Sequence, residues 1–228
     1  MEDGGGRDPL ESIRVRVLGK GAEAILYLEI WRGRLVIRKV RVPKRYRNPK
    51  LDIILRRWRT SLEAKLLYEA KRLGVPVPCI FDVDLDATTI VMEYIQGMRL
   101  RDVLSNLDSD VIRRYFEQIG ESVGILHKHG IVHGDLTTSN MIITRSGNVY
   151  LIDFGLGAFS HKLEDQGTDL HLMLRALEST HGALAQFCFK FFIRGYRKVM
   201  GSRTNEVLRK VKEIRSRGRY VAVEERRR

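Results

Sequence analysis

The sequence has few of the features that mark secreted, disulfide-stabilised or membrane proteins. It contains only two cysteines among 228 residues, and Cys79 and Cys188 are far apart and match no disulfide or metal-site spacing. This cysteine usage predicts a reducing, intracellular setting. No run of about 18 apolar residues occurs, which predicts no membrane span, and the acidic, glycine-rich start lacks the pattern of a signal peptide. Together these absences favour a cytoplasmic protein.

Acidic residues are fewer than basic ones, 28 Asp/Glu against 41 Lys/Arg, and the resulting positive charge is unevenly distributed. The net charge is +13, in a chain whose 43% hydrophobic content is ordinary for one globular domain or two small ones. Residues 194–228 hold 13 Lys/Arg against 4 Asp/Glu, whereas residues 101–193 hold 8 against 11. A basic end favours a polyanionic partner such as nucleic acid. A solvated, ion-paired surface of a heat-adapted protein is the alternative, and charge alone does not decide between them.

The most informative stretch runs from Ile131 to Gly155. It contains two short runs of β-branched residues on either side of Thr144–Asn148, a pattern that predicts a β-hairpin. Asp135 and Asn140 precede the hairpin and Asp153 follows it. Because a hairpin returns the chain to its starting point, we expect these three side chains to converge. Two carboxylates and an amide in one place suit a hard cation and an attacking hydroxyl.

The order of these polar residues is that of one catalytic motif. The pattern H-x-D-L-x-x-x-N begins at His133, and D-F-G begins at Asp153. This combination is the catalytic loop and metal-binding turn of the protein-kinase fold. A chance match of the whole set is improbable.

A glycine-containing turn, Gly19–Ala24, lies between strand patterns at 13–17 and 25–31. Glycines there would let backbone N–H groups approach phosphates, although the same pattern also occurs in any hairpin. The turn departs from the kinase pattern G-x-G-x-x-G, because Ala24 stands at the third glycine. Glu23 also places a negative charge where phosphates would lie, so its side chain must point away or pair with a nearby cation.

Lys39 lies in the next predicted strand, Leu35–Val40, where kinases carry the lysine that binds the α- and β-phosphates. Side chains alternate along a strand, so only one of Arg38 and Lys39 can face the site. Lys39 shares its face with apolar neighbours and is the favoured candidate. Glu63, on a helix predicted from Pro49 to Leu73, is the expected ion-pair partner that orients it.

The remaining elements follow from periodicity and capping. Asn48 is the predicted cap of the long helix and Gly74 its stop signal. We expect later helices at 164–180, 184–200 and 204–216, and an end without apolar periodicity that is mobile until bound. The apolar stripe of the long helix is predicted to comprise Leu51, Ile54, Leu55, Trp58, Leu62 and Leu66.

Taken together, the chain resembles the small atypical kinase of the KEOPS (EKC) complex, the PRPK-type family. The matching stretches cover nearly the whole chain and are LGKGAEA, the Lys39 strand, RVPKRYRNPKLD, RRWRTSLEAKLLYEA, IVMEYIQG, HGDLTTSNMII, IDFGLG, the EDQGTDLHLMLRALESTH helix and the closing RGR. The resemblance implies an α+β fold, a compact bilobal protein-kinase-like structure with a truncated helical C-lobe. The implied parts are an N-lobe at 1–95, a reduced C-lobe at 96–217 and a basic tail at 218–228.

The resemblance also implies an activity and partners. The family binds the threonylcarbamoyltransferase subunit and other KEOPS subunits, and supports threonylcarbamoyladenosine modification of tRNA. It acts chiefly as an ATPase and regulator, and Ser/Thr phosphorylation of proteins is also ascribed to it. The implied cofactors are ATP and Mg²⁺.

Transferred residue by residue, the resemblance gives each site residue a role. Lys39 would hold the phosphates, Glu63 would anchor Lys39, and Asp135 would orient the attacking hydroxyl or accept its proton. Asn140 and Asp153 would hold Mg²⁺. The full nucleotide-binding set is Gly19, Lys20, Gly21, Ala22, Lys39, Met92 as gatekeeper, the Glu93 carbonyl, the Ile95 N–H, Asn140 and Asp153. For tRNA we predict phosphate contacts by Arg215, Arg217, Arg219, Arg226, Arg227 and Arg228, with a merely solubilising tail as the alternative.

Departures from ordinary protein kinases favour ATP hydrolysis or self-phosphorylation over phosphorylation of free proteins. Gly134 stands where many kinases carry an arginine that pairs with a phosphorylated activation loop. Thr137 stands where Ser/Thr kinases carry a lysine that contacts the transferred phosphate. No Ala-Pro-Glu signature or long activation segment follows Gly155.

Three other interpretations stay open at this point. A small-molecule phosphotransferase of aminoglycoside or choline kinase type also uses His-Gly-Asp, but has a larger C-lobe with an acidic pocket. A RIO-type kinase is similarly compact, although the stretch from Arg41 to Asp52 argues against it. The third is a scaffold that binds nucleotide and tRNA without turnover.

Overall fold

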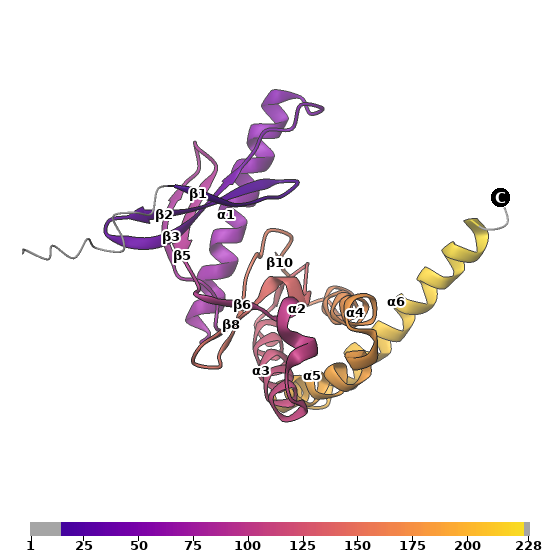
Figure 1. Ribbon diagram of the computed structural model, residues 1–228. Coiled ribbons are helices and arrows are strands. Elements are labelled where there is room, and N and C mark those ends of the chain that lie inside the picture. Colours follow the sequence, from indigo (N-terminus) through magenta and orange to yellow (C-terminus); the bar gives the residue numbers. More distant parts are fainter. Residues whose placement is uncertain (1–14, 226–228) are drawn as a thin grey trace, which may run out of the picture. The chain divides into compact units, whose positions relative to one another are not determined.

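The structure is a computed structural model that describes residues 15–225, with side chains described as far as Arg217. The predicted tRNA contacts of Arg219 and Arg226–Arg228 therefore lie outside the described residues. The chain forms two units (Figure 1). The first comprises the described residues up to Lys65 together with Pro78–Tyr94, and the second comprises Leu66–Val77 and the described residues from Ile95 onward.

The first unit combines an antiparallel sheet with the first part of helix α1. The strands lie in the order β1-β2-β3-β5-β4, so β3 is central. Their bounds are β1 Arg16–Lys20, β2 Ala24–Trp31, β3 Arg34–Arg41, β4 Ile80–Asp84 and β5 Thr89–Glu93. In β3, Lys39 lies opposite Leu26 of β2 and Ile90 of β5. The middle of the sheet therefore carries Lys39.

The prediction for the first strand and the glycine turn is wrong in its boundaries. Gly19 and Lys20, which we predicted in the turn, belong to β1 and lie opposite Leu26 and Ile25 of β2. The turn is correspondingly shorter and consists of Gly21–Glu23. A register shift between Val17 and Gly19 allows the pairing to continue through the glycine, as in a β-bulge.

Helix α1 runs from Pro49 to Arg72 and has the predicted ends. The Oδ1 atom of Asn48 accepts a hydrogen bond from the Lys50 N–H at 3.0 Å. Gly74, just past the helix, has φ +79°, a conformation that glycine adopts without a steric penalty.

The predicted apolar stripe of α1 is wrong for the first half of the helix. Leu51, Ile54 and Trp58 are 52%, 61% and 59% exposed. The side that is buried there is polar instead and consists of Asp52, Thr60 and Glu63. Asp52 and Thr60 bond to Arg56 of the same helix, and Glu63 is ion-paired with the sheet, so polar contacts replace apolar packing.

Arginine 56 illustrates how this polar side binds α1 to the sheet. Its Nε donates to Asp52 Oδ2 at 2.7 Å, and its Nη1 donates to the Thr88 hydroxyl oxygen at 2.9 Å. The Thr88 hydroxyl in turn donates to the Arg41 carbonyl at 3.1 Å. The helix is therefore tied to the edge of the sheet where β3 ends.

The second unit contains most of the helices and two small sheets, with strand orders β6-β8-β9 and β10-β7. The predicted hairpin is confirmed, since β8 and β9 pair antiparallel with Ile142 opposite Tyr150. The bounds are β6 Gly97–Arg99, α2 Leu100–Val103, η1 Leu104–Asn106, α3 Ser109–Lys128, β7 Ile131–Val132, η2 Thr138–Asn140, β8 Met141–Thr144, β9 Val149–Leu151, β10 Ala158–Phe159, α4 Leu163–Thr180, η3 Gly182–Leu184, α5 Ala185–Met200 and α6 Arg203–Glu225.

Helices α3 and α5 cross with their backbones in close contact. A Cβ atom at Gly120 would collide with the Phe192 carbonyl, and one at Gly195 would collide with the Glu117 carbonyl. Only glycine fits at these two positions. The crossing brings the fully buried Tyr196 ring of α5 against His127 of α3, with ring centroids 5.5 Å apart.

The last helix extends further than the sequence predicted. Helix α6 continues to Glu225, so the expectation of an irregular end after Ser216 is wrong for the backbone up to that residue. Two of the predicted tRNA-contacting residues are ion-paired within the second unit. Arg215 lies 3.0 Å from Glu178, and Arg217 lies 2.7 Å from Glu164.

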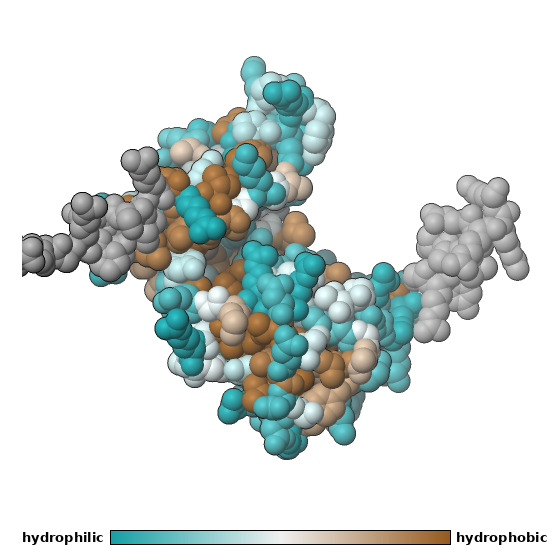
Figure 2. All heavy atoms as spheres, in the orientation of Figure 1, coloured by the Kyte–Doolittle hydropathy of each residue, from teal (hydrophilic) through white to brown (hydrophobic). Residues whose placement is uncertain are grey.

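The surface carries scattered apolar residues rather than a membrane segment. In the view of Figure 2, apolar residues gather over the strands of the first unit. The exposed residues include Val17 and Leu18 of β1, which are 44% and 43% exposed. Among the described residues, no helix combines the length and apolar character needed to span a bilayer.

Candidate active site

The first unit holds Lys39 and Glu63 in a buried ion pair. Lys39 Nζ lies 2.6 Å from Glu63 Oε1, and the two side chains are 8% and 1% exposed. Arg38, the competing residue on β3, points to the other face of the sheet and binds Glu29. The predicted pairing of Lys39 with Glu63 is therefore present.

A second cation shares the Glu63 carboxylate. Arg41 lies on the same face of β3 as Lys39, and its Nη2 donates to Glu63 Oε2 at 2.6 Å. Its side chain is 3% exposed. Each oxygen of Glu63 thus has its own cationic partner in this buried position.

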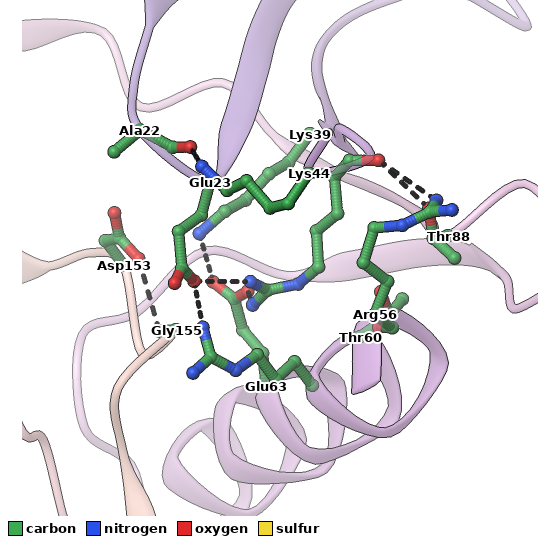
Figure 3. Close-up of polar contacts among 12 residues, drawn as sticks. Ala22, Glu23, Lys39, Lys44, Arg56, Thr60, Glu63, Thr88, Asp153 and Gly155 are labelled. Carbon is green, nitrogen blue, oxygen red and sulfur yellow. Dashed lines mark hydrogen bonds and ion pairs between the residues drawn. The ribbon is translucent and has the colours of Figure 1, made fainter. Parts of the chain in front are cut away.

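The turn residue Glu23 joins the same cluster. Its Oε2 accepts hydrogen bonds from Nη1 of Arg59, on α1, and from Nη1 of Arg41 at 3.4 Å. The dashed lines at Glu23 and Glu63 in Figure 3 mark these contacts. The sequence left open whether Glu23 points away or pairs with a cation, and the structure shows that it pairs. The hydrogen bond from Arg59 lowers the pKa of Glu23 below its usual range.

In the second unit, the loop before the hairpin brings Asp135 and Asn140 together. Asn140 Nδ2 donates to Asp135 Oδ2 at 2.8 Å and to the Asp135 carbonyl at 3.0 Å. The Asn140 carbonyl accepts the Ile152 N–H at 3.0 Å, next to Asp153. The predicted convergence of the catalytic loop with the D-F-G turn is thus present within this unit.

Asp153 itself adopts a left-handed backbone conformation, with φ +65°. Aspartate tolerates this region better than most residues. Its Oδ1 accepts the Gly155 N–H at 3.2 Å, which orients the carboxylate at the start of the turn.

The catalytic loop is also held by a buried carboxylate that the sequence analysis did not single out. Asp169, on α4, is 1% exposed. Its Oδ2 accepts the His133 N–H at 2.6 Å, and its Oδ1 accepts the Gly134 N–H at 2.8 Å. Burial opposes ionisation of Asp169, but the hydrogen bond from His127 and the loop contacts outweigh it, so its pKa is lowered.

His127 and Tyr196 continue this network into the core. His127 Nε2 lies 3.2 Å from Asp169 Oδ2, and its Nδ1 lies 2.9 Å from the Tyr196 hydroxyl. These contacts suit a ring that donates from Nε2 to Asp169 and accepts the tyrosine hydroxyl at Nδ1. Asp169, His127 and Tyr196 are therefore candidate positioning residues for the catalytic loop.

The backbone at Gly134 explains why no arginine stands there. Gly134 has φ +79°, and a Cβ atom at this position would collide with the Leu156 carbonyl oxygen. The departure from the common kinase motif that we noted in the sequence is thus imposed by the local backbone.

His133 is held in its neutral form. Its Nε2 donates to the Ile152 carbonyl at 3.1 Å, its Nδ1 accepts the Asp135 N–H at 3.3 Å, and its ring packs on Phe154 with centroids 4.5 Å apart. Burial lowers the pKa of His133, although the carboxylates of Asp169, Asp153 and Asp135 act in the opposite direction. Protonation at Nδ1 would also break the bond from Asp135.

This environment predicts a pH-dependent stability. The unfolded chain takes up a proton at His133 as the pH falls below about 6.5, whereas the folded chain does not. The contribution of neutral His133 to the free energy of unfolding is therefore complete above that pH. It is lost below that pH, at up to about 1.4 kcal/mol per pH unit. His133→Phe should remove this part of the slope between pH 7 and 5, measured by denaturant unfolding followed by circular dichroism.

The control for the His133 test is His129→Phe, because His129 is exposed and its ring Nδ1 bonds the Ile125 carbonyl of α3. It should leave the slope as in the wild type. His171 and His181, whose pKa values burial also lowers, contribute equally to all three proteins. Identical pH dependence in wild type and His133→Phe would contradict the prediction.

The predicted adenine-binding residues lie where β5 ends. Met92 is 8% exposed and Ile95 is 6% exposed. Glu93 is fixed on both sides by Cys79, because its N–H donates to the Cys79 carbonyl at 2.8 Å and its carboxylate accepts the Cys79 N–H at 3.0 Å. Their contacts with adenine remain predictions.

The donor set of the second unit fits Mg²⁺. Asn140 uses its amide nitrogen on Asp135, and its amide oxygen is the atom that would bind a metal together with the Asp153 carboxylate. Hard oxygen ligands in small number, completed by water and phosphate, are what Mg²⁺ takes in nucleotide sites. The described residues contain no cluster of three or more His, Cys, Asp or Glu side chains that could form a dedicated metal cage.

The sequence analysis missed three candidate functional residues, although a pattern in the sequence points to each of them. Asp169 interrupts the apolar stripe of α4 that includes Leu170 and Met173, so a carboxylate had to be buried there. Arg41 shares strand parity with Lys39, and Arg59 precedes Glu63 by one helical turn. Parity and helical spacing would thus have placed both arginines beside the predicted ion pair.

Comparison with known proteins agrees with this arrangement. Residues 15–177 match the protein kinase domain family. The KEOPS complex subunit Bud32 of Pyrococcus abyssi is 45% identical over 213 residues, which cover 90% of this chain and 96% of the relative. The chain belongs to the Bud32 family of protein kinases. The α+β kinase fold with a sheet-containing unit and a helical unit is therefore shown for it.

Other members of the Bud32 family differ in length. A probable serine/threonine-protein kinase BUD32 homolog of Archaeoglobus fulgidus is 42% identical over 186 residues, covering 82% of this chain and 89% of the relative. A probable bifunctional tRNA threonylcarbamoyladenosine biosynthesis protein of Methanothermobacter thermautotrophicus is 48% identical over 204 residues, covering 90% of this chain. The chain spans only 36% of that longer protein.

Proposed function

We propose that the chain is a Mg²⁺-dependent kinase-type ATPase that also self-phosphorylates or phosphorylates Ser/Thr residues slowly. The observation that carries this proposal is the buried Lys39–Glu63 ion pair, at 2.6 Å, in a chain that also holds Asn140 against the Asp135 carboxylate. A lysine fixed by a buried glutamate is the phosphate-binding device of kinases.

The roles of these residues follow from their chemistry. Lys39 would neutralise charge on the α- and β-phosphates, with Glu63 keeping its ammonium group in place. Asn140 and Asp153 would hold Mg²⁺, which when bound supplies positive charge to the β- and γ-phosphates. Asp135 would orient the attacking water and take its proton as the oxygen–phosphorus bond forms and the bond to ADP breaks.

Two features favour water over a protein hydroxyl as the acceptor. Gly134 leaves no arginine to engage a phosphorylated activation loop, and Thr137 supplies no lysine for the transferred phosphate. Loss of that cation removes neutralising charge in the transition state. Rapid phosphorylation of diverse free proteins by the isolated chain would contradict this part of the proposal.

We further propose that the chain works as a subunit of a KEOPS complex, with a threonylcarbamoyltransferase subunit as partner. The names of its relatives support this, since one is a KEOPS subunit and another is a bifunctional threonylcarbamoyladenosine biosynthesis protein. The process served would be threonylcarbamoyladenosine modification of tRNA.

The proposed activity is tested by phosphate release from ATP. The chain is purified alone and with its endogenous partners, and each preparation is assayed with Mg²⁺ in the presence and absence of tRNA. We expect Mg²⁺-dependent release that is higher in the assembly with tRNA. A preparation that binds ATP but shows no release above that of an Asp153→Asn protein purified identically would instead support a nucleotide-binding scaffold.

The basic end of α6 is proposed to contact tRNA phosphates. Truncation after Gly218 removes Arg219 and Arg226–Arg228, and we expect weaker tRNA binding with a shallower dependence on salt. Arg215 and Arg217 remain in the truncated protein, paired with Glu178 and Glu164. Binding is measured by fluorescence anisotropy over a salt series, and an unchanged slope would reject the tail as a tRNA contact.

A further inference from the structure

The ion-pair cluster around the glycine turn contains one carboxylate that another anion can displace. Lys39, Arg41 and Arg59 supply three positive charges, and Glu63 and Glu23 supply two negative charges. Glu63 is 1% exposed and bound on both oxygens. Glu23 is 36% exposed and belongs to a short turn. Glu23 is therefore the anion of this cluster that is most easily exchanged for another.

The turn is closed by internal contacts. The Gly21 N–H donates to the Ala24 carbonyl at 2.9 Å, and Lys44 Nζ donates to the Ala22 carbonyl. The Gly21 amide is thus used within the turn, and the Ala22 carbonyl is drawn toward a cation. A turn that cradles phosphates needs its N–H groups for the ligand, so this turn has to open at its tip for that purpose.

Arg41 and Arg59 are suited to bind a phosphate group in place of the Glu23 carboxylate. The planar guanidinium group binds carboxylate and phosphate oxygens with the same geometry. Arg41 Nε is buried and has no hydrogen-bond partner among the described residues. Arg41 also lies on the same strand face as Lys39, so an anion bound to Lys39 lies within the field of Arg41 as well.

We propose that Arg41 and Arg59 bind nucleotide phosphate, and that the Glu23 carboxylate occupies their anion site until phosphate displaces it. This inference rests on the proposed ATP binding, and it adds two phosphate ligands and an internal competitor to that site. When ATP binds, its phosphate replaces the Glu23 carboxylate at the two arginines. The phosphate carries more negative charge than the carboxylate, and Arg59 then links it to α1. No covalent change is involved.

The decisive variant is Glu23→Gln, which keeps the size of the side chain and removes its charge. We expect ATP to bind about fivefold to tenfold more tightly, the effect of losing one charge-assisted contact at a partly exposed site. The affinity for adenosine, which has no phosphate, should not change. Both affinities are measured by isothermal titration calorimetry, and Glu23→Ala serves as a second charge-removing variant.

Glu29→Gln is the matched control. Glu29 lies on β2 of the same unit, is ion-paired with Arg38, and changes the net charge of the protein by the same amount when neutralised. It should leave ATP affinity unchanged. Equal tightening in Glu29→Gln would assign the effect to total charge and overturn the proposal.

A double variant tests whether Arg59 binds phosphate or only holds Glu23 in place. If Arg59 binds phosphate, Arg59→Gln should weaken ATP binding about tenfold in the Glu23→Gln background, again without effect on adenosine. If Arg59 only holds Glu23, it should have no effect in that background, which would overturn its assignment. A wild type that binds ATP no better than adenosine would reject the proposed function, whereas tight ATP binding that Glu23→Gln leaves unchanged or weakens would reject this inference alone.

Discussion

Asp153→Asn is expected to lower ATP hydrolysis by about 10³-fold, because a metal clamp on the phosphates is worth several kcal/mol in the transition state. Asparagine tolerates the left-handed conformation of this position, φ +65°, and keeps an oxygen in place of the one that accepts the Gly155 N–H. The variant therefore removes the charge while preserving the turn. The measurement is steady-state phosphate release over a Mg²⁺ series.

Two comparisons distinguish the loss of metal binding from damage to the fold in the Asp153→Asn protein. ATP affinity in EDTA should not fall below that of the wild type, since without Mg²⁺ a carboxylate beside the phosphates repels them. Asp165→Asn, which alters a carboxylate of the same unit bound to the Ser160 hydroxyl, should retain normal hydrolysis. If Asp153→Asn kept more than about a tenth of the wild-type rate, Asp153 would not be the metal ligand.

Glu63→Gln is expected to destabilise the first unit by about 3–5 kcal/mol and to abolish tight ATP binding. The change removes the carboxylate that binds Lys39 and Arg41 at 2.6 Å each, and breaking a buried ion pair by removing one partner is costly. The loss is a large part of the stability of an ordinary domain. Both tryptophans, Trp31 and Trp58, lie in this unit, so their fluorescence during urea unfolding reports on it.

The control is Glu69→Gln, on the same helix and paired with Arg72 at the surface at 2.8 Å. It should change stability by less than about 0.5 kcal/mol. Adding Arg41→Met to Glu63→Gln should cost less than the sum of the two single changes, because each single change already removes the contact between Arg41 and Glu63. Equal unfolding midpoints for Glu63→Gln and Glu69→Gln would show that the buried pair contributes nothing.

Local patterns predicted the elements that carry the site. The hairpin after Asn140 followed from β-branched runs around a polar turn, and the ends of α1 followed from Asn48 and Gly74. The Lys39–Glu63 pair followed from strand parity together with the kinase resemblance. These features depend on a few neighbouring residues, which is why a single sequence reveals them.

Features that depend on tertiary contacts were missed. The side of α1 around Thr60 faces the sheet because arginines and carboxylates satisfy one another there, and the apolar periodicity pointed to the opposite side. Strands β7 and β10 have only two residues each and carry no periodicity. The anchoring of the catalytic loop by Asp169 involves residues 35 and 36 positions apart, beyond any local pattern.

The backbone of the catalytic loop limits how this protein can be regulated in evolution. Arginine at position 134 would need a left-handed conformation, which costs roughly 1–2 kcal/mol for a residue with a Cβ atom, and would also strike the Leu156 carbonyl oxygen. A single mutational step cannot install the arginine that reads a phosphorylated activation loop. Acquiring that form of control would therefore require the backbones around Gly134 and Leu156 to be remodelled together.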